Sequence, residues 1–195
     1  MIICISGKSG VGKDTIIDLI TSMSSFRKYP ACTTRLPREG EVDGIDYRFL
    51  DDSQFIRMEE EDLFLDHLEL SGRHYGLPKD GLDTEEDFIV NLNVESGLLL
   101  KEFQPKAILV FLRLPSRQEQ FKRLVHRGMS DADITKRLSD EHEPNRVAYI
   151  NYDLVLINNT NQQMQTVQHI LHFIKEAKID VISTEPRYAQ EARVA

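Results

Sequence analysis

The segment with the clearest chemical signature follows the first apolar run of the chain, Met1 to Ile5. It reads Gly7, Lys8, Ser9, Gly10, Val11, Gly12 and Lys13. Two of its glycines are separated by four residues and followed directly by lysine, which is the P-loop spacing. Backbone N–H groups of such a loop cradle phosphates, and the lysine reaches the β- and γ-phosphates of a nucleoside triphosphate such as ATP. A glycine-rich turn without a ligand is the alternative, and the strand before and the helix after the segment disfavour it.

The two residues that follow Lys13 could take part in binding a metal ion. The P-loop pattern places Ser or Thr directly after the lysine, but this chain has Asp14 there. Thr15, the next residue, supplies a hydroxyl that could lie near the phosphates or Mg²⁺.

A second group of residues could hold another phosphate. Arg35 and Arg38 are three residues apart and separated by Pro37, and Tyr47 follows in the same segment. Guanidinium groups match phosphate oxygens better than lysine does, so two of them can clamp one phosphate. A solvated, charged loop is the alternative that this pattern alone leaves open.

Short apolar runs alternate with stretches of helical spacing along most of the chain. The predicted strands are 2–5, 88–90, 107–114 and 154–157, and the predicted helices include 16–23, 116–127, 131–143 and 161–177. Continuous apolar strands are typical of a parallel sheet covered on both faces. The rhythm therefore predicts a P-loop-type α/β domain of three layers, α/β/α, with a parallel core sheet.

Two segments interrupt this rhythm. Residues 31–78 contain turn signals and short β-like pieces and resemble an insertion, whereas residues 127–140 are charged and resemble a mobile cover. Ser130 and Asp133 have the spacing of a helix cap. Pro144 is expected to end or kink the helix that begins after Ser130.

The composition excludes several classes of function. The net charge of −8 argues against nucleic-acid binding, and no apolar stretch approaches the length of a membrane span. The chain has two cysteines, Cys4 and Cys32, without a disulfide framework or a CxxC pair, which suits the cytoplasm. Cys4 is expected in the core, and Cys32 is interpreted as a packing residue.

The motifs on the acceptor side closely resemble those of the guanylate kinase family. Residues 33–49 fit T-T-R-x-P-R-x-G-E-x-x-G-x-D-Y-x-F, and residues 71–76 resemble that family's S-G-x-x-Y-G turn. Arg127-Gly128 with Lys136-Arg137-Leu138 resemble its lid, and Leu156-Ile157-Asn158-Asn159 resemble its last strand. The matches follow the family's order over about residues 1–175.

The resemblance implies one domain over residues 1–195 with a five-stranded parallel core. Its parts would be a core (1–30, 79–126 and 141–178), an acceptor-binding subdomain (31–78), a lid (127–140) and a tail (179–195). It assigns Thr34, Arg35, Arg38, Tyr47 and Tyr75 to the acceptor side, mostly at its phosphate. It assigns Arg127 and Arg137 to the transferring phosphates, with Arg123 nearby, and Asn158 and Asn159 to the donor adenine. With Lys13 and Mg²⁺, the arginines would offset the charge of both substrates.

The chain departs from the family where the guanine base binds. Asp66 aligns with a longer glutamate, Ala31 and Leu77 align with serines, and Asn93 aligns with an aspartate. Each buried polar group left unpaired costs ~1–3 kcal/mol, so the two lost hydroxyls should weaken guanine binding by ~10²-fold. Two interpretations remain open. In the first, the protein is a divergent guanylate kinase in which water or a shifted backbone replaces the lost hydroxyl groups. In the second, the acceptor is another nucleotide or a sugar phosphate.

A second pair of departures concerns Mg²⁺. Asp14 adds a carboxylate, and Asn91 replaces an aspartate that the family has on the middle strand. We expect Asp14 to take over part of the Mg²⁺ shell, because Mg²⁺ prefers oxygen ligands and keeps several waters. The alternative is that Asp14 only stabilises the first turn of its helix.

Three functions follow from these observations. The first is transfer of the γ-phosphoryl of ATP to GMP or dGMP, and the second is the same chemistry on a different phosphorylated acceptor. The third is a non-catalytic interaction module, which the intact Gly7, Gly12 and Lys13 disfavour. The expected partners are small-molecule nucleotides, and the expected assembly is a monomer or a homodimer.

Overall fold

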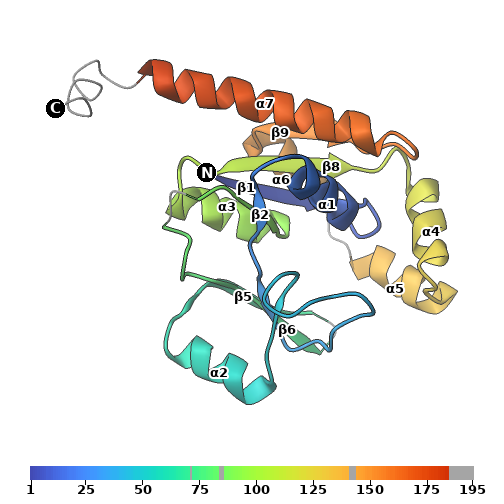
Figure 1. Ribbon diagram of the computed structural model, residues 1–195. Helices are drawn as coiled ribbons and strands as arrows, with labels where there is room; N and C mark the ends of the chain where they lie inside the picture. Colours follow the sequence, from blue (N-terminus) through green and yellow to red (C-terminus); the bar gives the residue numbers. More distant parts are fainter. Residues whose placement is uncertain (71, 84–85, 141–143, 185–195) are drawn as a thin grey trace.

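A five-stranded sheet forms the centre of the protein, for which a computed structural model describes residues 1–70, 72–83, 86–140 and 144–184 (Figure 1). All of its pairs are parallel, in the order β2-β7-β1-β8-β9. The strands are β1 (Ile2–Gly7), β2 (Arg27–Lys28), β7 (Phe88–Asn91), β8 (Ile108–Arg113) and β9 (Leu154–Ile157). The predicted parallel core is therefore confirmed.

Helices cover both faces of this sheet. On one face α1 (Lys13–Met23) and α7 (Gln163–Thr184) contact each other and pack with Ile3 and Ile5 of β1. On the other face α3 (Val94–Phe103) contacts α6 (Pro144–Asn151), and both pack in a cluster that contains Cys4. Neighbouring residues of a strand point to opposite faces, so strands covered on both faces, such as β1 and β8, carry apolar residues at consecutive positions.

A smaller sheet lies apart from the core and below it in Figure 1. It has the order β4-β3-β6-β5, with β3 (Cys32–Thr33), β4 (Arg48–Phe49), β5 (Phe64–Leu70) and β6 (Arg73–Pro78). Helix α2 (Asp52–Glu60) begins at a capping box made by Asp51 and Gln54 and buries Phe55 against Phe64, with ring centroids 4.5 Å apart. This unit has its own small core and forms one wall of the site described below.

Two helices lie at the edge of the core, and residues of the first of them line part of the site described below. Helix α4 (Arg117–His126) contacts α5 (Asp131–Asp140), which begins after Ser130. Ser130 Oγ accepts from the Asp133 backbone at 3.2 Å and donates to its carboxylate at 2.6 Å, so the predicted cap is present. Helix α5 reaches Asp140, and residues 141–143, where the predicted helix would end, lie outside the described residues. Pro144 is the first described residue of α6, and proline suits the first turn of a helix.

The last helix is longer than predicted. Helix α7 continues to Thr184, beyond the expected core boundary at 178, and residues 185–195 of the expected tail lie outside the described residues. Within the described part of the chain, no helix is both long and apolar enough to cross a membrane.

Both cysteines are fully buried thiols. Cys4 lies in the sheet core and Cys32 packs with Phe55 and Phe64, as the sequence predicted. Burial raises the pKa of Cys4 to about 12 and that of Cys32 to about 11. Neither thiol therefore ionises near neutral pH.

Candidate active site

The phosphate-binding loop joins β1 to α1 at the carboxyl edge of the sheet. Gly7 and Gly12 have φ angles of 152° and 94°. A Cβ on Gly7 would lie 2.4 Å from the Leu112 carbonyl oxygen, and one on Gly12 would lie 3.0 Å from Asn158 Nδ2. Glycine is therefore required at both positions for backbone conformation and for close packing. The loop folds back through a hydrogen bond from Val11 N to Lys8 O at 3.1 Å.

Two side chains from distant elements hold this loop in place. Arg123 of α4 donates to the Val11 carbonyl at 3.1 Å and to the Asn158 carbonyl at 2.9 Å. Asn158, which is only 1% exposed, donates to the same Val11 carbonyl at 2.8 Å and accepts from Thr166 at 3.1 Å. Both ends of the Asn158 amide are thus engaged within the protein. The structure gives Arg123 and Asn158 a loop-positioning role that spacing alone could not indicate.

A cavity of about 510 Å³ lies on the α4 side of the loop. Its lining residues are Gly10, Gly12, Thr15, Glu119, Lys122, Arg123, His126, Arg127, Asn158, Thr160 and Gln163. Asn159 is not among them; its amide donates to Gln162 Oε1 at 3.0 Å. We refer to this space as the donor cavity.

A second cavity, of about 280 Å³, lies between the loop and the smaller sheet. Its lining residues are Gly7, Ser9, Lys13, Asp14, Ala31, Arg35, Arg38, Tyr47, Asp66, Leu68, Tyr75, Gly76, Leu77, Asn91, Leu92, Asn93, Ser96 and Arg127. This space, the acceptor cavity, brings together nearly all the residues predicted for the acceptor. Thr34 is the exception, because it is buried and its hydroxyl accepts from His74 N at 3.0 Å.

One basic residue lines both cavities. Arg127 caps the carboxyl end of α4 and borders the donor and the acceptor cavity. Arg137, its predicted companion, belongs to α5, but its side chain lies outside the part that the structure describes. Lys13 borders the acceptor cavity and donates to the Gly7 carbonyl at 2.6 Å.

The predicted arginine clamp is organised by a residue that sequence reasoning missed. Both carboxylate oxygens of Glu41 accept from Arg35, at 2.8 and 2.9 Å, and one also accepts from Arg38 N at 2.7 Å. Partial burial raises the pKa of Glu41, but the Arg35 hydrogen bonds outweigh it and lower the pKa overall. Glu41 therefore stays ionised and orients the guanidinium group. The dipeptide Gly40-Glu41, which follows the two arginines, was the feature of the sequence that could have indicated this role of Glu41.

Tyr47 and Tyr75 lie near Arg35, and the Tyr47 hydroxyl is suited to donate a hydrogen bond while uncharged. The guanidinium carbon lies 5.3 Å from the centre of the Tyr47 ring, and the Tyr47 and Tyr75 rings are 6.4 Å apart. Burial, followed by the charge of Asp14, raises the pKa of Tyr47 to about 12. The Tyr47 hydroxyl therefore keeps its proton and can donate it to an anionic ligand.

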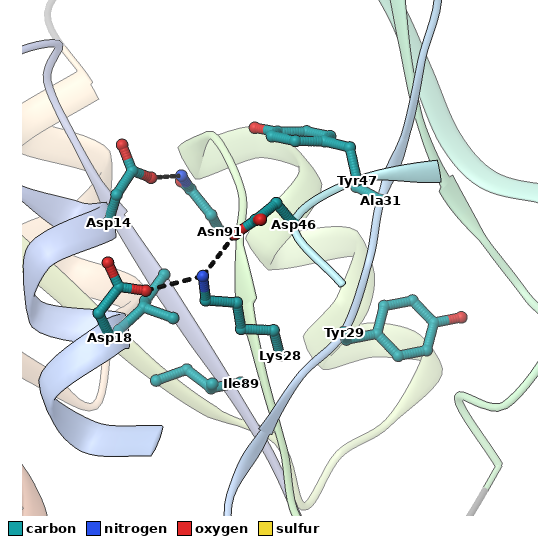
Figure 2. A pocket seen from close by; sticks show the side chains of 10 residues that line it. Asp14, Asp18, Lys28, Tyr29, Ala31, Asp46, Tyr47, Ile89 and Asn91 are labelled. Carbon is teal, nitrogen blue, oxygen red and sulfur yellow. Dashed lines mark hydrogen bonds and ion pairs between the residues drawn. The ribbon is translucent and has the colours of Figure 1, made fainter. Parts of the chain in front are cut away.

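The two unusual polar residues at the start of α1 and the end of β7 contact each other directly. Asn91 Nδ2 donates to Asp14 Oδ1 at 2.9 Å (Figure 2). Asp14 borders the acceptor cavity, whereas its neighbour Thr15 borders the donor cavity. The structure thus brings Asp14 and Asn91 together, as the paired substitution suggested, but it places Asp14 and Thr15 on different cavities.

Near Asp14 and Asn91, Lys28 connects helix α1 to the loop that carries Asp46 and Tyr47, which we call the acceptor loop. Lys28 Nζ lies 2.7 Å from Asp18 of α1 and 2.5 Å from Asp46, which precedes Tyr47 (Figure 2). Partial burial lowers the pKa of Lys28, but the hydrogen bonds with the two carboxylates outweigh it and raise the pKa. These groups line a cavity of about 90 Å³ that shares Asp14, Ala31, Tyr47 and Asn91 with the acceptor cavity. Lys28 therefore positions the loop that carries Tyr47.

Replacing Lys28 with methionine should raise the KM for the acceptor by about 5-fold and leave kcat nearly unchanged. An ion pair worth about 1 kcal/mol corresponds to this factor, and the lost interaction orders the loop without contacting the reacting atoms. Steady-state kinetics at saturating donor measures both constants. Arg27→Met is the matched control, because Arg27 is the neighbouring residue on β2, is exposed, pairs with Glu86 and lines neither cavity. An unchanged KM in Lys28→Met would contradict the positioning role.

The chain is similar to known proteins over most of its length. The guanylate kinase family model matches residues 1–177. A guanylate kinase from Clostridium acetobutylicum is 32% identical over 100% of this chain and 95% of its own length. One from Thermus thermophilus is 36% identical over 81% of this chain and 74% of its own length.

A solved structure supports the same fold. The crystal structure of guanylate kinase from Anaplasma phagocytophilum has a TM-score of 0.67 and 22% identity, covering 90% of this chain and 85% of that one. The loop, the two cavities, the family model and the relatives at 32–36% identity all lead to one assignment. The chain belongs to the guanylate kinase family.

Proposed function

We propose that this protein transfers the γ-phosphoryl group of ATP to GMP or dGMP. The observation that carries the proposal is the pair of cavities on opposite sides of one phosphate-binding loop, with Arg127 bordering both. A donor and an acceptor bound there would meet beside Lys13 and Arg127. Phosphoryl transfer depends on positioning and charge neutralisation, and these cationic groups supply both.

We divide the chain into segments according to the part that each would take in this reaction. We assign residues 31–78 to acceptor binding and residues 127–140 to a lid over the transferring phosphates. Arg35, Arg38, Tyr47 and Tyr75 would bind the acceptor phosphate, because all of them line the acceptor cavity. The donor base would lie in the cavity beside Asn158. The reaction needs no second chain, so the protein could act as a monomer or as a homodimer. Its ligands would be small-molecule nucleotides, and the cytoplasm would be a suitable compartment.

An ADP-release assay tests the proposal directly. The purified protein is supplied with ATP and Mg²⁺ and with GMP, dGMP, AMP, CMP, UMP, dTMP or phosphosugars in turn. Turnover of GMP and dGMP is the expected result. Turnover of another acceptor alone would replace the substrate, and no turnover with any acceptor would contradict the kinase function.

We also propose that Asp14 helps to hold Mg²⁺. Its Oδ1 is occupied by the Asn91 amide, which leaves Oδ2 for a metal ion or a metal-bound water. Mg²⁺ bound by one carboxylate, phosphates and water is a common arrangement, and the ion would neutralise charge on the transferring group. Among the described residues no group of three or more histidine, cysteine, aspartate or glutamate side chains could hold a metal ion, so phosphate oxygens would complete its shell.

Replacing Asp14 with asparagine should weaken the effect of Mg²⁺. We expect the Mg²⁺ concentration for half-maximal rate to rise about 10-fold, because losing a group that holds a metal ligand in place typically costs about 10- to 100-fold in metal affinity. Calorimetric titration of ATP with and without Mg²⁺ separates metal binding from catalysis. Asp52→Asn is the matched control, because Asp52 is also an acidic residue in the first turn of its helix, α2, and lines neither cavity. If Mg²⁺ dependence stays the same in Asp14→Asn, the residue only stabilises its helix.

A further inference from the structure

A buried glutamine of helix α4 contacts the phosphate-binding loop. Gln120 is 3% exposed, and its Nε2 donates to the Ser9 carbonyl at 3.0 Å. A buried amide costs free energy unless it is hydrogen-bonded, and here the bond is made to the loop rather than within the helix. Gln120 lines neither the donor nor the acceptor cavity, so it would act on a ligand only through the loop.

The same face of α4 contacts the loop at two further points. Gln120, Arg123 and Leu124 have the spacing of residues on one face of a helix. Arg123 donates to the Val11 carbonyl at 3.1 Å. Leu124 lies so close to Gly10 that a Cβ there would be 3.3 Å from Leu124 Cδ2. Helix α4 therefore binds two carbonyl groups of the loop and packs against the residue between them.

These contacts fix the direction of two N–H groups of the loop. The C=O and N–H bonds of a trans peptide unit point in opposite directions, and no cis peptide bond occurs among the described residues. Because the Ser9 carbonyl points toward Gln120, the Gly10 N–H points away from that side chain. The Val11 carbonyl fixes the Gly12 N–H in the same way. Both glycines line the donor cavity, and N–H groups of such a loop are the donors that cradle phosphate.

Glycine makes both of these peptide units easy to rotate. Gly10 and Gly12 have φ angles of 79° and 94°, in a region that glycine occupies about as readily as negative φ. The peptide unit that joins Ser9 to Gly10 could therefore turn its N–H to another direction at little steric cost. The hydrogen bond from Gln120 opposes that rotation, because the carbonyl of the same unit would have to leave its donor.

We propose that Gln120 is a positioning residue for the phosphoryl donor. By holding the Ser9 carbonyl, it keeps the Gly10 N–H in the direction in which it binds the triphosphate. It takes no part in binding the acceptor. The inference rests on the proposed kinase function for the identity of the donor, and it adds a residue outside both cavities that determines donor affinity.

Calorimetric titration of Gln120→Met with ATP and Mg²⁺, without acceptor, tests this role directly. Methionine keeps the length and the helix propensity of the side chain but cannot donate. We expect the Kd for ATP to rise about 5-fold, as the loss of one amide–carbonyl hydrogen bond implies. Gln118→Met is the matched control, because Gln118 is an exposed residue of the same helix and lines neither cavity. A Kd within about 2-fold of that of the unmodified protein would overturn the inference.

Steady-state kinetics separates positioning of the donor from a general loss of structure. In Gln120→Met the KM for ATP should rise by the same factor as the Kd, whereas the KM for GMP should not change. An equal rise of both KM values would overturn the positioning role. If the unmodified protein binds ATP but phosphorylates no acceptor, the kinase function is wrong, and the titration still decides the role of Gln120.

A second variant keeps the inference testable if Gln120→Met does not fold. Gln120→Leu replaces the buried amide with a hydrocarbon side chain beside Leu124 and likewise removes the donor to Ser9. Thermal unfolding shows which variants are folded, and each folded variant should bind ATP more weakly than Gln118→Met. If folded Gln120→Leu binds ATP as tightly as this control, the inference is wrong.

Discussion

Replacing Lys13 with alanine should reduce kcat by about 10³-fold. Lys13 ends the phosphate-binding loop and borders the acceptor cavity, and removing one group directed at the transferring charge typically costs about 10²- to 10³-fold. In this structure its ammonium group donates to the Gly7 carbonyl at 2.6 Å, so it is held at the loop before a phosphate arrives. The ADP-release assay at saturating ATP and acceptor measures the loss.

The same variant should remain folded. Losing one partly exposed hydrogen bond costs about 1 kcal/mol, which lowers the melting temperature of a protein of this size by about 2–4 °C. Lys106→Ala is the control, because Lys106 is exposed and precedes β8 at the sheet edge opposite the loop. If Lys13→Ala retains activity within 10-fold of the unmodified protein, the assigned role of the lysine is incorrect.

Replacing Arg35 with alanine should raise the KM for the acceptor by about 10²-fold and also lower kcat. Charge-assisted hydrogen bonds to phosphate contribute about 1.5–3 kcal/mol, which corresponds to about 10- to 150-fold. The variant also leaves Glu41 without its partner beside the phosphate site, and its charge would repel the acceptor. Steady-state kinetics with GMP as the varied substrate separates the two constants.

Two further variants identify the source of that loss. Arg35→Lys keeps the charge but cannot form the paired contact with Glu41, so we expect an intermediate KM. Glu41→Gln keeps the shape of the partner and removes its charge, so its KM should rise by less than that of Arg35→Ala. An acceptor KM that does not change in Arg35→Ala would place the phosphate elsewhere in the cavity.

Local sequence patterns predicted the core of the fold well. The four longer strands of the parallel sheet contain continuous apolar runs because both of their faces are covered, whereas the edge strand β2, Arg27–Lys28, does not. The phosphate loop has a spacing that few other structures need. These features depend on neighbours in the sequence. For the same reason the cap at Ser130 could be predicted from its spacing to Asp133 alone.

Helix α3 shows why other elements were missed. It contains Gly97, which weakens a helical pattern, yet a Cβ there would lie 2.3 Å from the Tyr152 hydroxyl. The glycine is necessary because Tyr152, which follows α6, and Cys4 of β1, whose Sγ would lie 3.2 Å from that Cβ, both approach it closely. Gln120 likewise has a role only because α4 lies against the phosphate-binding loop, and Lys28 because the acceptor loop approaches it. Contacts between distant segments decide these positions.

The burial of Cys4 and Cys32 makes the protein convenient for spectroscopy. Thiols that ionise only near pH 11 or 12 do not react with maleimides at neutral pH while the protein is folded. A single cysteine introduced on the exposed surface of α5, for example at Asp131, would therefore be the reactive thiol in an otherwise native background. A second one on α2 would complete a dye pair. Fluorescence energy transfer between them could follow closure of α5 and α2 around the substrates, without first removing the natural cysteines.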